Sequence, residues 1–231
     1  MIPKNILHTS YRASLLRTST RLNRRSFSVK MTDKPRRRLN RPALFICDIQ
    51  EKFRGPIWEY EKLILTTQKM LSAASILSIP VYATTQNRAR LGETCSELDL
   101  SSAIEHVDKT AFSMWIPRIS QHFSSSTPSE IVLVGIETHI CITQTTLDLL
   151  AAGHKVYVLA DGVSSCNKEE IGIALERLRG AGAVVTTSES WIYECMGDAA
   201  IGEFRDVAGL VKRCSKDTKE VLGALAGRSK I

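Results

Sequence analysis

Short apolar runs alternate along this chain with longer segments in which apolar residues recur every three or four positions. The short runs have the length and the composition of buried strands. They lie at residues 43–47, 81–85, 104–107, 130–134, 155–160 and 183–187. The longer segments predict helices at residues 60–77, 115–123, 139–150, 168–178, 188–196 and 201–212. This alternation predicts an α/β fold, a three-layer doubly wound sheet of about six mainly parallel strands.

Three side chains that could take part in catalysis come directly or shortly after predicted strands. Asp48 comes directly after the run 43–47, Lys109 comes shortly after 104–107, and Cys141 follows the run 130–134 and Gly135. The site of a doubly wound sheet lies beyond the carboxyl ends of its strands. We therefore expect the three side chains to converge at one edge of the sheet.

Cys141 is the candidate nucleophile. Gly135 allows a sharp turn after the strand, and Thr138 is expected to cap the helix that begins near His139. Cys141 then lies in the first helical turn, where free N–H groups and the helix dipole stabilise a thiolate. The alternative interpretation is a small buried hydrophobic residue, which is the more common role of a single cysteine.

Asp48 and Lys109 supply the groups that a cysteine nucleophile needs. A carboxylate at the end of a buried strand can accept the thiol proton, and a nearby ammonium favours the thiolate electrostatically. Backbone N–H groups of the loop 135–141 can hold an oxyanion. Each residue alone would more often be a turn residue or a surface charge, so the prediction depends on their joint placement.

Other catalytic and binding templates are absent from the sequence. It has no Gly-x-Ser-x-Gly elbow, no Gly-x-Gly-x-x-Gly fingerprint and no Gly-Lys-Ser/Thr phosphate loop. The five His show no metal-ligand spacing, and the six Cys include no Cys-x-x-Cys pair. His139 is two residues from Cys141, a spacing that does not bring side chains together on a helix. We therefore expect neither a metal nor a cofactor. The scattered cysteines also predict that the protein is located in a reducing compartment.

Charge is divided unevenly along the chain. Residues 1–42 carry twelve Lys and Arg against one acid, a net charge of +11, whereas the remainder carries 19 basic and 23 acidic residues, a net charge of −4. The folded body is therefore mildly acidic, and no nucleic-acid partner is expected. No run approaches the roughly 18 apolar residues of a membrane-spanning helix, so no membrane association is expected either.

The first 32 residues resemble a mitochondrial presequence. They hold no acid, are rich in Arg, Ser and Thr, and include Arg24-Arg25-Ser26, which is similar to a matrix processing site. The alternatives are a disordered basic tail, or translation from Met31. We expect a presequence and basic linker at 1–40, disordered or cleaved, a domain at 41–214 and a weakly structured tail at 215–231. The expected location is the mitochondrial matrix.

Three ordered blocks resemble a known family. They are Asp48-Ile49-Gln50-Glu51-Lys52-Phe53, Lys109-Thr110-Ala111-Phe112-Ser113 and Gly135-Ile136-Glu137-Thr138-His139-Ile140-Cys141. They look like the signature blocks of the isochorismatase-like (cysteine hydrolase) superfamily, and the resemblance covers about residues 41–212. The similarity is greatest to isochorismatase domain-containing proteins of the mitochondrial type.

The resemblance implies a fold, a triad and a loop geometry. The triad would be Asp48, Lys109 and Cys141. The Ile136–Glu137 peptide would be cis, and the N–H groups of Glu137 and Cys141 would form the oxyanion hole. Four further positions match the family near its substrate, with core packing or a loop hydrogen bond as an equal alternative: Gln50, Phe53, Phe112 and Trp115. The family also implies a homo-oligomer.

One departure from the family narrows the expected function. Nicotinamidases of this family carry an Asp-x-His and further His metal ligands, and residues 84–92 contain none. We therefore expect a metal-independent enzyme. True isochorismatases cleave a vinyl ether with the Asp and do not require the Cys, so the presence of Cys141 favours a cysteine hydrolase that cleaves a C–N bond of a small amide-like substrate through a thioester on Cys141. Two alternatives stay open. One is a vinyl-ether hydrolase of the isochorismate type that uses Asp48, and the other is a non-catalytic member that acts through protein contacts.

Overall fold

The structure, a computed structural model, describes residues 37–123 and 126–226 and contains one six-stranded sheet. All five strand pairings are parallel, and the strand order is β3-β2-β1-β4-β5-β6. The strands are β1 (Pro42–Cys47), β2 (Val81–Gln86), β3 (Glu105–Lys109), β4 (Glu130–Ile136), β5 (Lys155–Ser164) and β6 (Val184–Thr186). The order reverses between β1 and β4, so the predicted doubly wound α/β fold is confirmed.

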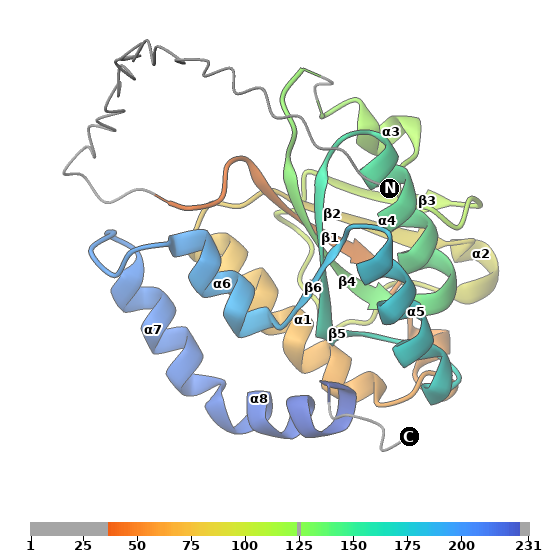
Figure 1. Ribbon diagram of the computed structural model, residues 1–231. Coiled ribbons are helices and arrows are strands. Elements are labelled where there is room, and N and C mark those ends of the chain that lie inside the picture. The colour runs from red at the N-terminus through yellow and green to blue at the C-terminus, as the bar shows by residue number, and fades with distance from the viewer. Residues whose placement is uncertain (1–36, 124–125, 227–231) are drawn as a thin grey trace, which may run out of the picture. The chain divides into compact units, whose positions relative to one another are not determined.

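Helices connect the strands on both faces of the sheet (Figure 1). The longer ones are α1 (Tyr60–Ile76), α4 (Thr143–Ala151), α5 (Lys168–Gly180), α6 (Ser188–Met196) and α7 (Phe204–Arg213). The shorter ones are η1 (Glu51–Phe53), α2 (Arg88–Leu91), α3 (Pro117–Ser120), η2 (Thr138–Ile142), α8 (Ser215–Val221) and η3 (Leu222–Ala226). Within the described ranges, no helix combines the length and the apolar character that crossing a bilayer requires.

Alternation along β1 divides the core into two layers. Leu44 and Ile46 pack in the cluster that includes α1, α6, α7 and α8, whereas Phe45 and Cys47 pack in the cluster that includes α3, α4 and α5. Figure 1 shows these two groups of helices on opposite sides of the sheet. Because side chains alternate between faces with a period of two, Cys47 faces the helix that follows β4.

The helix expected at residues 115–123 is much shorter in the structure. Only α3, Pro117–Ser120, is α-helical there. Ile116, directly before Pro117, is extended with φ −95° and ψ 159°. A residue before proline is excluded sterically from the α region, so the helix begins at the proline and not at Trp115.

The folded domain extends beyond both of its predicted boundaries. The prediction of a weakly structured tail at 215–231 was wrong as far as residue 226, because α8 and η3 occupy 215–226. Val221 and Leu225 are buried in the same cluster as α1, and these two side chains help to anchor the segment. At the other end, Leu39 belongs to this core and Arg37 donates to the Leu77 carbonyl, so the domain begins before residue 41.

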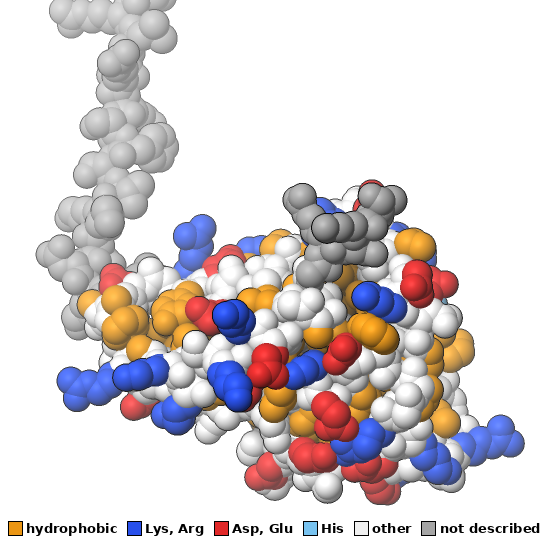
Figure 2. All heavy atoms as spheres, turned by 90° about the horizontal axis from the view of Figure 1, so that it is seen from below, with side chains coloured by type: hydrophobic (Ala, Val, Ile, Leu, Met, Phe, Trp, Pro, Cys, Tyr) orange, Lys and Arg blue, Asp and Glu red, His pale blue; other side chains and the backbone are white. Residues whose placement is uncertain are grey.

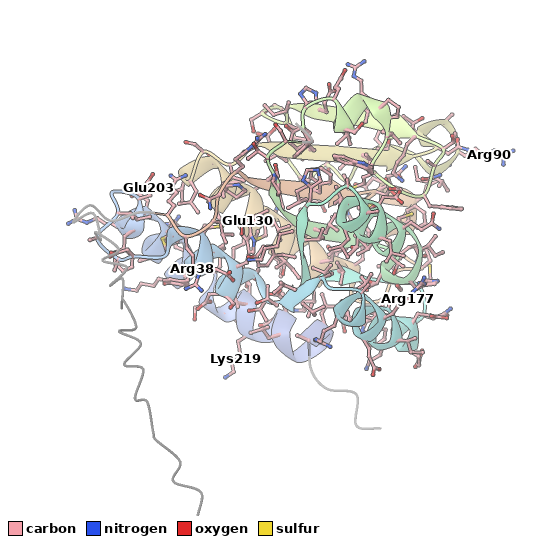
Figure 3. The ribbon with its side chains drawn as sticks, turned by 45° about the horizontal axis from the view of Figure 1, so that its top comes forward. Arg38, Arg90, Glu130, Arg177, Glu203 and Lys219 are labelled. Atoms are coloured by element: carbon pink, nitrogen blue, oxygen red, sulfur yellow. The ribbon has the colours of Figure 1, made fainter. Side chains whose placement is uncertain are left out.

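The surface of the domain carries charges of both signs. On the face shown in Figure 2, Lys and Arg side chains alternate with Asp and Glu side chains. Figure 3 shows Arg90, Arg177 and Lys219 projecting outward from α2, α5 and α8.

Candidate active site

Strand register aligns the ends of four neighbouring strands at the carboxyl edge of the sheet. Cys47, the last residue of β1, pairs with Thr84 of β2 on one side and with Gly135 of β4 on the other. Gln86 of β2 pairs with Lys109, the last residue of β3. The residues after these positions therefore meet over one edge, as the sequence predicts.

Asp48 lies at the centre of this edge with its carboxylate buried. Its Oδ2 accepts a hydrogen bond from Lys109 Nζ at 2.7 Å and one from Cys47 Sγ at 3.4 Å. Its Oδ1 accepts a hydrogen bond from the Thr84 hydroxyl at 2.7 Å. The backbone of Asp48 is left-handed, with φ +56°, which turns the side chain back over the strand end. Aspartate tolerates this conformation better than most residues.

Lys109 is buried as a cation surrounded by oxygen atoms. Besides Asp48, its Nζ donates to Gln86 Oε1 at 2.7 Å and to the carbonyls of Phe112 and Ala111 at 3.0 and 3.1 Å. Burial alone lowers the pKa of Lys109, but the acidic groups around it outweigh burial and raise that pKa above its ordinary value. Lys109 therefore stays protonated beside the carboxylate.

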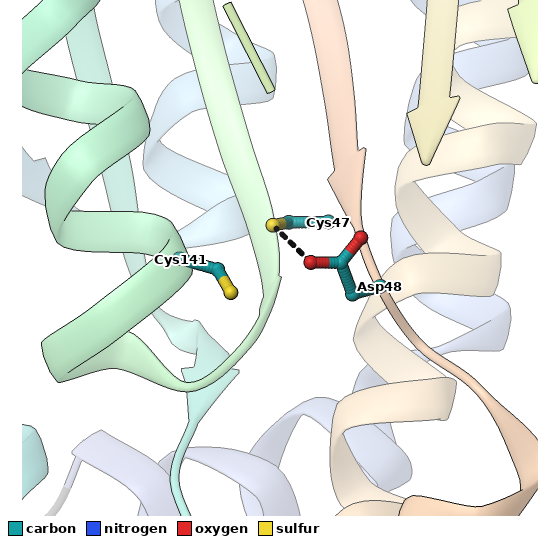
Figure 4. A group of neighbouring side chains, drawn as sticks. All are labelled: Cys47, Asp48 and Cys141. Carbon is teal, nitrogen blue, oxygen red and sulfur yellow. Dashed lines mark hydrogen bonds between the residues drawn. The ribbon is translucent and has the colours of Figure 1, made fainter. Parts of the chain in front are cut away.

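Figure 4 shows the side chain of Cys141, from the segment that follows β4, near those of Cys47 and Asp48 at the end of β1. Its Sγ, the Cys47 Sγ and a carboxylate oxygen of Asp48 all lie within 4.8 Å of one another. Cys141 is 6% exposed, whereas Cys47 is completely buried, so the nucleophile candidate is the sulfur nearer to solvent. The three residues that the sequence singled out are thus brought together.

A π-turn positions Cys141. The segment η2, Thr138–Ile142, is a π-helix that runs directly into α4. The Glu137 carbonyl accepts the N–H groups of Ile140 and Ile142, on either side of Cys141 in the chain. Such π-turns are rare and occur often at functional sites, because they re-aim a side chain and its N–H group.

Gly135 allows the two halves of the site to approach each other. A Cβ at this position would lie 2.3 Å from the Cys47 carbonyl oxygen and 2.6 Å from the Cys47 Cβ. Its φ of +144° is also one that side chains disfavour. Glycine is therefore required for β4 to pass this close to the end of β1.

The loop after Gly135 differs from two expectations. The prediction of a cis peptide between Ile136 and Glu137 was wrong, since every peptide bond of the described chain is trans. The turn is made by Glu137, which is left-handed with φ +55° and ψ +67°. Thr138 was also expected to cap the helix, but its buried hydroxyl has no hydrogen-bond partner among the described residues.

The side chain of Glu137 fastens the loop to the end of β5. Its carboxylate accepts the Cys166 thiol at 2.8 Å and lies 3.4 Å from His139 Nδ1. His139 Nδ1 also lies 3.1 Å from the Ser165 hydroxyl. His139 thus points to Glu137 and Ser165, in agreement with the prediction that it does not pair with Cys141.

The predicted substrate residues fall into different environments. The Gln50 side chain accepts a hydrogen bond from the Gln86 N–H at 2.7 Å and donates to the carbonyls of Gln86 and Gly92 at 3.2 and 2.6 Å. Its amide therefore holds the segment after β1 against the end of β2 and the loop at Gly92. Phe53 is partly buried against the α1 side of the core. The Phe112 carbonyl accepts a hydrogen bond from Lys109, and the Phe112 residue is 49% exposed, so its ring is open to solvent.

Trp115 does not join the site. Its ring packs 5.1 Å from the His154 ring and 5.5 Å from the Phe123 ring, measured between centroids. His154 directly precedes β5, so this aromatic group lies toward the amino ends of the strands. Asp48 and Cys141 lie at the carboxyl ends, and the expectation that Trp115 lines their pocket was wrong.

One group of potential metal ligands occurs among the described residues, and it is the site itself. Cys47, Asp48 and Cys141 have the donor types of a zinc site. The Lys109 ammonium, 2.7 Å from Asp48, already provides a positive charge there, and a second cation would be repelled. The group fits proton transfer to and from sulfur better than it fits a metal ion.

Three residues at the site were missed by the sequence analysis. Thr84 holds Asp48, Gln86 holds Lys109, and Cys47 lies against both Asp48 and Cys141. Thr84 and Gln86 are two positions apart in β2 and so face the same side. That spacing was visible in the sequence, but the register that sets them against Asp48 and Lys109 was not.

Comparison with known proteins now identifies the family. The Isochorismatase domain model matches residues 42–190, which is more than half of the chain. The chain belongs to the isochorismatase family. Its matched region begins with β1 and ends in α6, so it includes Asp48, Lys109 and Cys141.

Members of the isochorismatase family from distant organisms are similar to this chain. The secreted isochorismatase effector Isc1 of Phytophthora sojae is 42% identical over 176 residues, 74% of this chain and 84% of the effector. Human isochorismatase domain-containing protein 2 is 36% identical over 190 residues, 82% of this chain and 91% of that protein. A solved structure described as MAR1 ribonuclease from Caenorhabditis elegans is 38% identical, with a TM-score of 0.71, and covers 78% of this chain and 93% of that one.

Proposed function

We propose that this isochorismatase-family protein is a metal-independent cysteine hydrolase that cleaves the C–N bond of a small amide-like substrate. The observation that carries the proposal is the buried group of Asp48, Lys109 and Cys141 at the carboxyl edge of the sheet. A thiol needs a base to become a nucleophile and a positive charge to remain an anion; Asp48 lies beside this sulfur, and Lys109 is paired with Asp48.

In the first half of the reaction, Asp48 accepts the proton of the Cys141 thiol and Lys109 stabilises the resulting thiolate. The sulfur attacks the amide carbonyl and forms a tetrahedral anion. The N–H groups of Glu137, directly before the π-turn, and of Cys141, within it, are the proposed donors to that anion. Asp48 returns the proton to the departing nitrogen, and the C–N bond breaks to leave a thioester on Cys141 and free ammonia or amine.

In the second half, water hydrolyses the thioester. Asp48 accepts a proton from the water, hydroxide attacks the thioester carbonyl, and the C–S bond breaks. The carboxylic acid leaves, and Cys141 recovers its proton. Thr84 and Lys109 hold the carboxylate of Asp48 from two directions throughout, so the same base serves both halves.

The test is a turnover screen with small aliphatic and aromatic primary amides, in which ammonia release is measured. We expect Cys141→Ala to lose at least about a thousandfold in rate while remaining folded. Cys214→Ala is the matched control, because Cys214 is a half-buried cysteine between α7 and α8, and it should retain the wild-type rate. Wild-type turnover by Cys141→Ala would overturn the assignment of the nucleophile.

Vinyl-ether hydrolysis of an isochorismate-like compound is the second candidate. The similarity to the Phytophthora sojae protein named an isochorismatase effector favours it. Asp48 would then act as a general acid, and the cysteine would not be needed. Retained cleavage of isochorismate by Cys141→Ala, together with loss in Asp48→Ala, would replace the amide proposal with this one.

The screen should also contain RNA, because the similar Caenorhabditis elegans structure is described as a ribonuclease. We propose that the partner is a small molecule, because the candidate nucleophile is 6% exposed and the domain is mildly acidic. Cleavage of RNA that Cys141→Ala abolishes would contradict this part of the proposal. A protein that turns over none of these compounds would instead support a non-catalytic role through protein contacts.

A further inference from the structure

The site contains a second sulfur that the proposed hydrolysis does not use. Cys47 ends β1 on the α4 side of the sheet, and its Sγ lies within 4.8 Å of the Cys141 Sγ. The Cys47 thiol also donates a hydrogen bond to Asp48 Oδ2. The closeness is built into the fold, because Gly135 lets the backbone of β4 pass against Cys47.

We propose that Cys47 and Cys141 form an oxidisable dithiol, in which a hydroperoxide oxidises Cys141 and Cys47 then closes a disulfide with it. Cys47 takes no part in the proposed hydrolysis. A second thiol within reach of a reactive cysteine is the arrangement that diverts a sulfenic acid to a disulfide before further oxidation. The inference shares Cys141 with the proposed function but requires no amide turnover.

The first step oxidises Cys141. Its thiolate attacks the terminal oxygen of the hydroperoxide, and the O–O bond breaks. The departing oxygen takes up the proton that the thiol released and leaves as water or an alcohol. Cys141 is then a sulfenic acid, and the peroxide has accepted two electrons from its sulfur.

The second step closes the bond. Cys47 transfers its proton to Asp48 Oδ2, which it already contacts at 3.4 Å, and its sulfur attacks the Cys141 Sγ. The S–O bond breaks, and the hydroxide takes the proton from Asp48 and leaves as water. Disulfide sulfurs are about 2 Å apart, so rotation of the two side chains must bring the sulfurs together.

The order of the two steps follows from the environments of the thiols. Cys47 is completely buried, and burial, the neighbouring Cys141 thiol and the Asp48 charge hold its pKa well above the ordinary thiol value. It therefore keeps its proton in the reduced protein. Cys141, the more exposed of the two, is the sulfur that a small peroxide in the site meets first.

The other described cysteines are less suited to this role. Cys95 and Cys195 are buried in the core on the α1 side of the sheet, opposite to Cys141, and the half-buried Cys214 packs against the same α1-side cluster. Cys166 is exposed, and its thiol donates to Glu137 at 2.8 Å. Cys166 is therefore the alternative partner that an experiment has to separate from Cys47.

The test is peptide mapping of the full-length protein after stepwise addition of hydrogen peroxide. Free thiols are alkylated with iodoacetamide, and the protein is digested and analysed by mass spectrometry without reductant. We expect a linked pair of peptides containing Cys47 and Cys141, lighter by two hydrogen atoms than the separate peptides and separated again by dithiothreitol. The readout is a mass and not a rate, so failure of the amide proposal leaves it intact.

Two variants make the result specific. Cys166→Ser should keep the Cys47–Cys141 link. Cys47→Ser should lose it, and its Cys141 should advance to sulfinic and sulfonic acid, which dithiothreitol does not reverse. If Cys47→Ser does not fold, the mapping of the wild-type protein decides alone. Irreversible oxidation of wild-type Cys141, a link from Cys141 to Cys166, or an unoxidised Cys141 would each overturn the proposal.

Discussion

Thr84 and Thr85 are adjacent residues of β2 with opposite orientations, and they allow a matched test of the base. The Thr84 hydroxyl donates to Asp48, whereas the Thr85 hydroxyl donates to Asp108 at 2.9 Å on the other side. A hydrogen bond to a charged group contributes about 1.5–3 kcal/mol. Thr84→Val should therefore lower the rate of amide hydrolysis roughly tenfold or more.

Thr85→Val is the control, since it removes the same hydroxyl from the same strand without touching Asp48. Its rate should equal that of the wild type in the same ammonia-release assay. Equal rates for both variants would show that the Thr84 hydrogen bond has no part in positioning the base.

Gly135 permits a prediction about stability. In Gly135→Ala the new methyl group would lie 2.3 Å from the Cys47 carbonyl oxygen, at a φ that alanine disfavours. We expect a loss of about 3 kcal/mol or more in the free energy of unfolding, measured by urea denaturation. Gly172→Ala, on the exposed face of α5 with no atom within 4 Å of the new carbon, should gain about 0.5–1 kcal/mol. A harmless Gly135→Ala would contradict the close approach of β4 to β1.

At the residue scale, the sequence predicts the three candidate catalytic residues better than it predicts the residues that hold them in place. Asp48, Lys109 and Cys141 are found from their positions after strands. Thr84, Gln86 and Cys47 are not, because their roles depend on the register between strands, which no single strand encodes. The trans peptide before Glu137 is also a local backbone choice that the pattern of side chains does not determine.

At the scale of elements, α1 and α8 meet around a buried lysine. Lys69 of α1 is 3% exposed, and its Nζ donates to the Thr218 hydroxyl of α8 at 2.9 Å. Burial lowers the pKa of Lys69 in the folded protein, against partial compensation by surrounding acidic groups. At pH values between the pKa of Lys69 in the folded protein and its higher pKa in the unfolded chain, the unfolded chain binds more protons than the folded protein. Stability should therefore rise with pH in this window below about 10.5.

Lys69→Met tests this linkage. The variant removes the buried ammonium and retains most of its volume, so it should be neutral or more stable by about 1 kcal/mol near pH 7. Its free energy of unfolding should lack the part of the alkaline rise that Lys69 contributes. Lys219→Met, at an exposed position of α8, should keep the wild-type slope in the same urea titrations. Equal slopes for the wild type and Lys69→Met would contradict the prediction.

Elements with strong apolar patterns are predicted well, and those held by tertiary contacts are not. The strand β1 and the helix α1 begin and end within one residue of the expected positions. The helix α8 and the η3 turn that follows it have a weak pattern, and they pack through Val221 and Leu225, which reach the core beside α1. Such anchoring depends on a surface that exists only after the sheet and α1 have formed.

At the scale of the whole molecule, we propose a homo-oligomer in the mitochondrial matrix. Residues 1–36, on which the targeting prediction depends, lie outside the described residues. A fluorescent protein fused after residue 40 should accumulate in the matrix and lose its leader there. Replacing Arg24 and Arg25 with Ala should shift or prevent the cleavage, as read by N-terminal sequencing. A fusion that stays in the cytosol with its leader intact would contradict the proposal.

In the proposed reaction, the Cys141 sulfur carries the acyl group as a thioester between the two halves. Acid quenching during turnover of a primary amide, followed by peptide mass spectrometry, tests it directly. We predict an acyl adduct on the peptide containing Cys141, labile to hydroxylamine and absent from Cys141→Ala. Steady turnover with no adduct on Cys141, or with the acyl group on another residue, would contradict the account.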